Sequence, residues 1–105
     1  MKKIIFVAVL ALAASAPAVA ADPEAGQKKS QPCTTCHGPD GNSPSPEFPK
    51  LAGQHYDYLV QALKDYKSGA RKNPIMAPQA ANLTIRDIED LAAYYSKQRG
   101  LVVKY

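Results

Sequence analysis

The sequence predicts an all-α domain of three or more short helices separated by two long loops. Two segments repeat apolar residues at helical spacing, and helix-start and helix-stop residues bound them. No segment gives a convincing strand pattern. The nine prolines and six glycines among 105 residues indicate a loop-rich chain.

The N-terminal segment reads as a secretory signal peptide. Met1-Lys2-Lys3 is basic, residues 4–14 form an unbroken apolar run, and Ala18-Val19-Ala20 offers small residues to a signal peptidase. Such a run is too short to cross a hydrocarbon core of ~30 Å, so a membrane anchor is the weaker interpretation. We therefore expect residues 1–20 to be removed, with cleavage after Ala21 as the alternative.

The remaining chain, residues 21–105, is expected to be a single exported domain without a membrane-spanning segment. Loss of Lys2 and Lys3 lowers the formal net charge from +4 to +2, which argues against nucleic-acid binding. Two cysteines are too few for a disulfide-rich scaffold, and the chain is too short for a large enzyme. A domain this small often needs a metal, a disulfide or a large cofactor.

The first helix is expected to start at Asp22-Pro23-Glu24, a cap followed by proline and an acidic residue. It should run to about Gln31, where Pro32 interrupts it. Residues 38–53 contain four prolines and form a long loop, which in a compact domain is usually functional.

The next helix should span residues 55–68, where Leu59, Ala62, Leu63 and Tyr66 form one apolar stripe before Gly69 stops the helix. Residues 70–82 have little periodicity and are expected to form the second loop.

The last helix has the clearest start signal. Thr84 is the expected N-cap, Asp87 completes an acidic capping box, and Leu83 and Ile88 occupy the hydrophobic-staple positions. Gly100 follows the helix.

The segment Cys33-Thr34-Thr35-Cys36-His37 is a C-x-x-C-H motif, the attachment signature of c-type haem. Two thiols three positions apart lie on one side of a helical turn, where each can add to a porphyrin vinyl group. The adjacent histidine then supplies an axial nitrogen ligand to the iron.

Three other interpretations of this motif are weaker. A thioredoxin-type dithiol needs a βαβ setting that this chain lacks. A zinc site of Cys33, Cys36, His37 and His55 does not match the usual ligand spacing. A disulfide between the two cysteines would close a very short loop and stabilise little.

The sequence also resembles the small class I c-type cytochromes of bacterial periplasms, especially the short single-haem forms and the half-domains of dihaem cytochromes. The resemblance covers nearly all of residues 21–105. The matching segments are Cys33-Thr34-Thr35-Cys36-His37-Gly38, Asp40-Gly41-Asn42, Phe48-Pro49-Lys50-Leu51-Ala52-Gly53-Gln54, Tyr58-Leu59, Leu63, Tyr66, Gly69, Arg71, Met76, Asp87-Ile88 and Leu91-Ala92-Ala93-Tyr94.

The resemblance implies a small cytochrome c fold, with three to five short helices and long loops wrapped around one covalent haem c. It implies that Met76, the single methionine after processing, is the second axial iron ligand opposite His37. The alternatives are His55 as the second ligand, or a vacant sixth position open to small gases.

The resemblance further implies supporting roles around the haem. The carbonyl of Pro46 is expected to accept a hydrogen bond from His37, and Gly26 and Tyr94 are expected to meet between the first and last helices. Candidates for hydrogen bonds to the haem propionates are Gln54, Arg71 and Asn73. Candidates for the apolar haem pocket are Leu51, Leu59, Leu63, Ile75, Ile88 and Leu91.

The function implied is electron transport by a periplasmic carrier that is not itself an enzyme. Its partners would be periplasmic or membrane-bound redox proteins, met briefly through a small interface. The lysines expected around that interface are Lys50, Lys72 and either Lys28 or Lys29. The competing function is a haem-based sensor or haem enzyme with an open sixth site.

Overall fold

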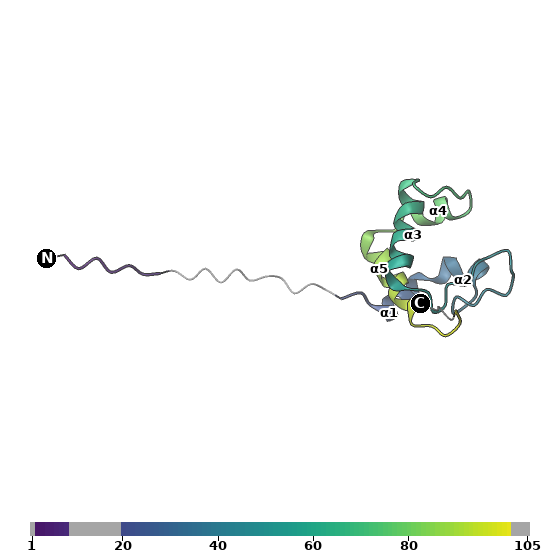
Figure 1. The fold of residues 1–105 in the computed structure, drawn as a ribbon, viewed down its shortest axis with the longest axis horizontal. Helices are drawn as coiled ribbons and strands as arrows, with labels where there is room; N and C mark the ends of the chain where they lie inside the picture. The colour runs from purple at the N-terminus through teal and green to yellow at the C-terminus, as the bar shows by residue number, and fades with distance from the viewer. Residues whose placement is uncertain (1, 9–19, 102–105) are drawn as a thin grey trace.

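The structure, a computed structural model, describes residues 2–8 and 20–101 and contains five helices and no strand within them (Figure 1). The helices are α1 (Pro23–Lys29), α2 (Gln31–His37), α3 (Tyr56–Ser68), α4 (Met76–Ala81) and α5 (Ile85–Ser96). The predicted all-α class is confirmed, and so is the absence of regular structure in residues 38–53.

The expected signal peptide falls mostly outside the described residues. Residues 2–8 adopt neither helix nor strand and expose the apolar side chains of Ile4, Ile5 and Phe6. The rest of the apolar run, together with Ala18 and Val19 of the expected cleavage signal, is not among the described residues. In the described part of the chain, no helix is long and apolar enough to cross a membrane.

The start of α1 follows the predicted signals. The Asp22 carboxylate accepts a hydrogen bond from the backbone N–H of Glu24 at 2.9 Å, and Pro23 occupies the first helical position. The helix ends at Lys29, and α2 begins at Gln31 with Pro32 in its first turn. A first-turn proline needs no hydrogen-bond partner for its nitrogen, so Pro32 opens a second helix as well as ending the first.

Helix α3 matches its predicted range to within one residue. It ends at Gly69, which adopts a left-handed φ of 86° and donates its N–H to the carbonyl of Asp65. This is the conformation that glycine permits at the end of a helix.

Helix α4 corrects the prediction that residues 70–82 form only a loop. The Asn73 side-chain oxygen accepts hydrogen bonds from the N–H groups of Ile75 and Met76, each at 2.9 Å, and so caps the helix from three residues upstream. Pro78 lies in the first turn, where its missing N–H leaves no helical hydrogen bond unmade. The prolines that suggested a loop are therefore compatible with this short helix.

Helix α5 forms the centre of the domain and packs against α1 and α3. Thr84 and Asp87 form the predicted capping box at its start. The contact predicted between Gly26 and Tyr94 is confirmed, since a Cβ atom at Gly26 would lie 2.9 Å from the Cβ of Tyr94. The buried core cluster comprises Leu59, Leu91, Ala92, Tyr94 and Tyr95.

A buried ion pair joins α1 to α5. Asp90 is 2% exposed and accepts from the Lys29 ammonium at 2.7 Å and from the Asp22 N–H at 2.9 Å. Arg86 lies 3.2 Å from the same carboxylate, and Lys29 also pairs with Asp87 at 2.9 Å. These contacts satisfy a carboxylate that would be costly to bury alone.

Candidate functional site

One cavity of about 340 Å³ lies between α2, the loop of residues 38–53, α3, α4 and α5. This volume falls within the range of small-molecule and cofactor sites. Figure 1 shows α2 and α4 in different parts of the domain, and both helices contribute to the cavity wall. The lining includes five of the six apolar side chains expected to bury haem, which are Leu51, Leu59, Leu63, Ile75 and Leu91. Ile88 is fully buried in the core instead.

Helix α2 brings the C-x-x-C-H motif to the cavity. Cys33, Cys36 and His37 all line it, and both cysteines are half-buried free thiols. The disulfide interpretation therefore does not describe this structure. One helical turn presents two thiols and an imidazole to the same space, as covalent haem attachment requires.

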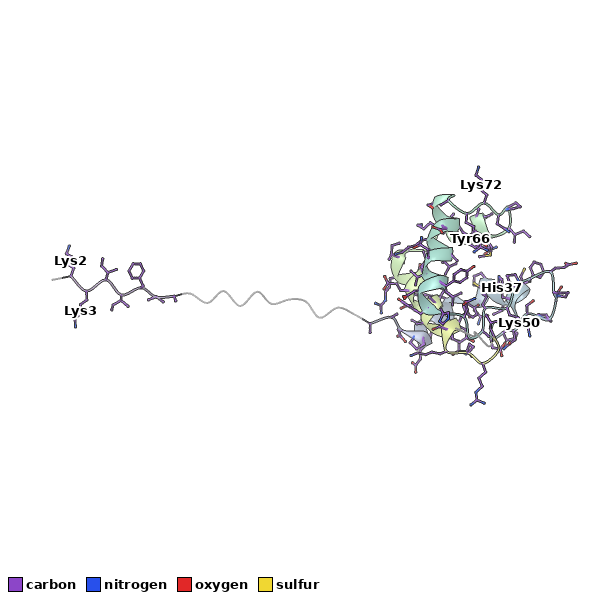
Figure 2. The ribbon with its side chains drawn as sticks, in the orientation of Figure 1. Lys2, Lys3, His37, Lys50, Tyr66 and Lys72 are labelled. Carbon is purple, nitrogen blue, oxygen red and sulfur yellow. The ribbon has the colours of Figure 1, made fainter. Side chains whose placement is uncertain are left out.

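His37 is buried and held by the long loop. Its Nδ1 donates a hydrogen bond to the backbone carbonyl of Pro49 at 2.8 Å. With Nδ1 protonated, the Nε2 atom is left as the acceptor that can bind a metal. Figure 2 shows His37 near Lys50, which follows Pro49 in this loop.

The prediction that Pro46 supplies this carbonyl is wrong. The N–H of Phe48 donates to the carbonyl of Ser45 at 3.2 Å, closing a turn that leaves Pro46 exposed and outside the cavity lining. The chain returns to α2 only after this turn, so Pro49 is the proline whose carbonyl reaches His37.

Met76 enters the cavity from the first residue of α4 and is half-buried. Asn73, expected to bind a propionate, also lines the cavity, but its side-chain oxygen is committed to capping α4. Only its amide nitrogen remains to donate toward a ligand.

Gln54 and Arg71 line the cavity as well. The Gln54 side-chain oxygen accepts from the backbone N–H of His55 at 2.9 Å. The Arg71 guanidinium lies 4.8 Å from the ring centroid of Tyr66 and donates to the Tyr58 hydroxyl at 3.3 Å. Figure 2 shows Tyr66 on α3, between His37 and Lys72.

Aromatic residues complete the cavity wall. Phe48, Tyr58, Tyr66 and Tyr95 all line it, although none of them was among the residues expected in the haem pocket. The helical spacing of Tyr66 and Tyr95 indicated burial, but a helix packed against a core and a helix packed against a cofactor show the same apolar stripe.

The donor set fits haem better than a lone metal ion. Among residues 2–8 and 20–101, no three His, Cys, Asp or Glu side chains are placed to hold a metal ion together, and His55 is not part of the cavity lining. Two thiols, an imidazole nitrogen and a thioether sulfur around an apolar space are the groups that a covalent, six-coordinate haem uses.

The cytochrome c family model matches residues 23–98 of this sequence. The chain belongs to the cytochrome c family. It is 45% identical to cytochrome c4 of Stutzerimonas stutzeri, over 97% of this chain and 53% of that protein. It is 44% identical to cytochrome c-554(548) of Halomonas halodenitrificans, over 75% of this chain and 99% of that protein.

The fold of this cytochrome c is also found in a solved relative. The crystal structure of reduced cytochrome c4 from Pseudomonas stutzeri superposes with a TM-score of 0.74 at 48% identity, covering 79% of this chain and 48% of that one. The chain spans about half the length of the curated relatives named cytochrome c4. It is therefore similar to one half-domain of these proteins.

Family membership establishes the cofactor and the general function. A cytochrome c carries covalently bound haem c and transfers electrons, and the C-x-x-C-H motif at Cys33 and Cys36 provides for one such haem. Family membership therefore confirms the predicted haem c and the predicted role in electron transport.

Proposed function

We propose that this chain is a periplasmic one-electron carrier whose haem c is attached through Cys33 and Cys36 and ligated by His37 and Met76. The main support is a single cavity that receives two thiols and an imidazole from α2 and a thioether sulfur from α4. Bound haem c supplies the Fe(III)/Fe(II) couple.

The protein contributes fixed positions for both axial ligands. The Pro49 carbonyl orients the His37 ring, and the Asn73 side chain caps the helix that starts at Met76. With His37 and Met76 both bound to the iron, no position on it would be left for substrate, which supports a carrier and not an enzyme. A methionine ligand also raises the reduction potential relative to two histidines.

We further propose that residues 1–20 direct export and that residues 21–105 form the mature cytochrome domain. The basic, apolar and small-residue regions of the N-terminal segment support export. Arrival in the periplasm would place the domain with periplasmic or membrane-bound redox partners.

Transient contact with those partners would involve exposed lysines near the cavity. Lys50 and Lys72 are both exposed, and Figure 2 shows Lys72 beyond Tyr66 and Lys50 close to His37. Lys29 also lines the cavity, but its ammonium pairs with Asp87 and Asp90. Lys50 and Lys72 are therefore better candidates than Lys29 for pairing with an acidic partner.

The test is expression of the full chain with its own leader in a bacterium that matures haem c. Exported protein should be heavier than the processed polypeptide by one haem, with an N-terminus at residue 21 or 22. Met76→Ala should lose the iron–sulfur charge-transfer band and bind carbon monoxide rapidly when reduced, whereas His55→Ala should retain the band.

Other results would contradict the proposal. A folded product without haem would exclude electron transfer by this route. Rapid carbon monoxide binding by the reduced unmodified protein would instead favour a sensor or enzyme with an open sixth site. Loss of the native ligand spectrum in His55→Ala would assign the second ligand to that histidine.

A further inference from the structure

Tyr95 carries a buried hydroxyl group for which the described residues provide no hydrogen-bond partner. The side chain is 3% exposed and lies near the end of α5, among the residues that line the cavity. Burying an unpaired hydroxyl is unfavourable, and most buried polar groups in folded proteins are hydrogen-bonded. A hydroxyl left in this state beside a cofactor cavity therefore requires an explanation.

The ring that carries this hydroxyl is fixed on several sides. A Cβ atom at Gly41 would lie 2.8 Å from the Tyr95 ring, so the glycine backbone packs directly against it. The Tyr94 ring centroid is 5.0 Å away, and the Tyr95 carbonyl accepts from the N–H of Gly53 at 2.9 Å. With the ring and backbone held, the hydroxyl cannot turn outward to water without disrupting the core.

Cys33 shares the cavity wall with Tyr95. Its side chain packs against the core cluster that includes Tyr95, and both residues line the cavity. Burial raises the pKa of the Cys33 thiol, and the neighbouring Tyr95 hydroxyl acts in the opposite direction. A sulfur atom accepts hydrogen bonds weakly, and a tyrosine hydroxyl is a suitable donor.

Ser30 is the other polar neighbour of Tyr95. Its hydroxyl is buried and already donates to the carbonyl of Gln27 at 2.6 Å. Ser30 therefore has no hydrogen left to offer Tyr95 and can meet the Tyr95 hydroxyl only as an acceptor. Unlike Cys33, it does not line the cavity.

We infer that, once the sulfur of Cys33 is joined to haem, the Tyr95 hydroxyl donates a hydrogen bond to that sulfur and so acts as a positioning residue that tunes the haem through it. The inference rests on the proposed function, because it requires the sulfur of Cys33 to be joined to haem. The hydroxyl directs the positive end of its dipole toward that attachment point. Positive potential there favours Fe(II), the state with less positive charge on the iron.

Replacing Tyr95 with phenylalanine removes the hydroxyl and retains the ring. At equilibrium with a fixed redox mediator, we expect the ratio of oxidised to reduced haem to be about two- to fivefold higher in haem-loaded Tyr95→Phe than in the parent. The loss of one modest hydrogen bond would have an effect of this size. We also expect a shift of the thioether carbon–sulfur stretch in the resonance Raman spectrum and a lower melting temperature.

Tyr94→Phe is the matched control on the same helix. The Tyr94 hydroxyl donates to the Pro39 carbonyl at 3.0 Å, and Tyr94 does not line the cavity. We expect this variant to lose thermal stability while its redox equilibrium and carbon–sulfur stretch stay unchanged.

Three results would overturn the inference. Tyr95→Phe could match or exceed the parent in stability, with an unchanged redox equilibrium and carbon–sulfur stretch, which would mean that the hydroxyl stays unpaired. Ser30→Ala could reproduce the spectral and redox shifts, which would assign the hydrogen bond to Ser30. Tyr94→Phe could shift the equilibrium equally, which would make the effect unspecific.

The haem content of each preparation separates this inference from the proposed function. A pyridine haemochrome spectrum measures covalent haem c directly. Protein without haem c contradicts the proposed function and the inference together, whereas haem-loaded Tyr95→Phe with parental behaviour contradicts only the role of Tyr95.

Discussion

The imidazole of His37 donates from Nδ1 to the carbonyl oxygen of Pro49 at 2.8 Å, joining α2 to the loop of residues 38–53. The loop is closed at Gly41, whose carbonyl accepts from the N–H groups of Leu51 and Ala52 at 2.8 and 3.2 Å. The orientation of the histidine ring therefore depends on a loop closure made beyond both partners, at Gly41 after His37 and at Leu51 after Pro49.

Gly41→Ala should open this loop. Gly41 has a φ of 87°, and an added Cβ would lie 2.9 Å from the Ala52 nitrogen. We expect a loss of about 2–4 kcal/mol in the free energy of unfolding, from strain and overpacking together, measured by denaturant titration. The Nδ1 proton of His37 should also exchange faster in NMR spectra.

Gly69→Ala is the control for backbone strain alone. Gly69 has a similar φ of 86°, with nothing within 4 Å of an added Cβ. We expect it to lose about 1 kcal/mol and to leave the His37 proton unaffected. Equal proton exchange in the Gly41→Ala variant and the parent would show that the loop does not control the ring.

Gly26→Ala should separate α1 from α5. An added Cβ would collide with the backbone carbonyl of Asp90, whose carbon would lie 2.6 Å away. We expect a loss of about 2–4 kcal/mol in the free energy of unfolding. Ala25→Gly in the same helix should cost about 1 kcal/mol through helix propensity alone. Stabilisation by Gly26→Ala would contradict the tight contact, since propensity by itself favours alanine.

Local signals allowed much of the fold to be predicted from the sequence. The Thr84 and Asp87 capping box and the Gly69 helix stop act within a few residues, and the structure has both. The start of α4 is also local, because Asn73 caps it from three residues away. The prolines at positions 74 and 78 concealed this signal by making the segment resemble a loop.

Contacts between distant segments were harder to predict. The choice between Pro46 and Pro49 depends on how the turn at Ser45–Phe48 directs the loop back to α2, which residue spacing does not determine. Tyr95 illustrates the same limit, since its position in an apolar stripe predicts burial but not an unpaired hydroxyl on a residue of the cavity wall.

Asn73→Ala should loosen the helix that carries Met76. It removes the acceptor for the N–H groups of Ile75 and Met76, and the loss of a helix cap costs about 1 kcal/mol. We expect a weaker iron–sulfur charge-transfer band that disappears at lower temperature than in the parent. Asn73→Asp should restore the band because a carboxylate also caps. Asn82→Ala, at the opposite end of α4, should leave the band unchanged, and an equal loss there would indicate general destabilisation.

The cluster around Asp90 should make stability depend on acid pH. Burial by itself would raise the pKa of Asp90, but the Asp22 N–H and the Lys29 ammonium outweigh it and lower the pKa below its usual value. The Thr84 N–H, followed by Lys29, lowers the pKa of Asp87. Carboxylates with lowered pKa values stabilise the fold above the unfolded pKa of about 4, and this contribution is lost as the pH falls through the folded values.

Asp90→Asn removes the charge and retains an acceptor for the Asp22 N–H. We expect a loss of about 1–3 kcal/mol in the free energy of unfolding at pH 7, and a shallower fall in stability below pH 4 than in the parent. Denaturant titrations of haem-loaded protein between pH 7 and pH 3 measure both, while the charge-transfer band reports loss of ligation separately. Asp57→Asn, an exposed change in the first turn of α3, should keep the parental acid slope. If Asp90→Asn instead kept the parental dependence of stability on acid pH, other groups would be responsible for the acid sensitivity. The charge on Asp90 would then contribute equally to the free energies of the folded and unfolded chains.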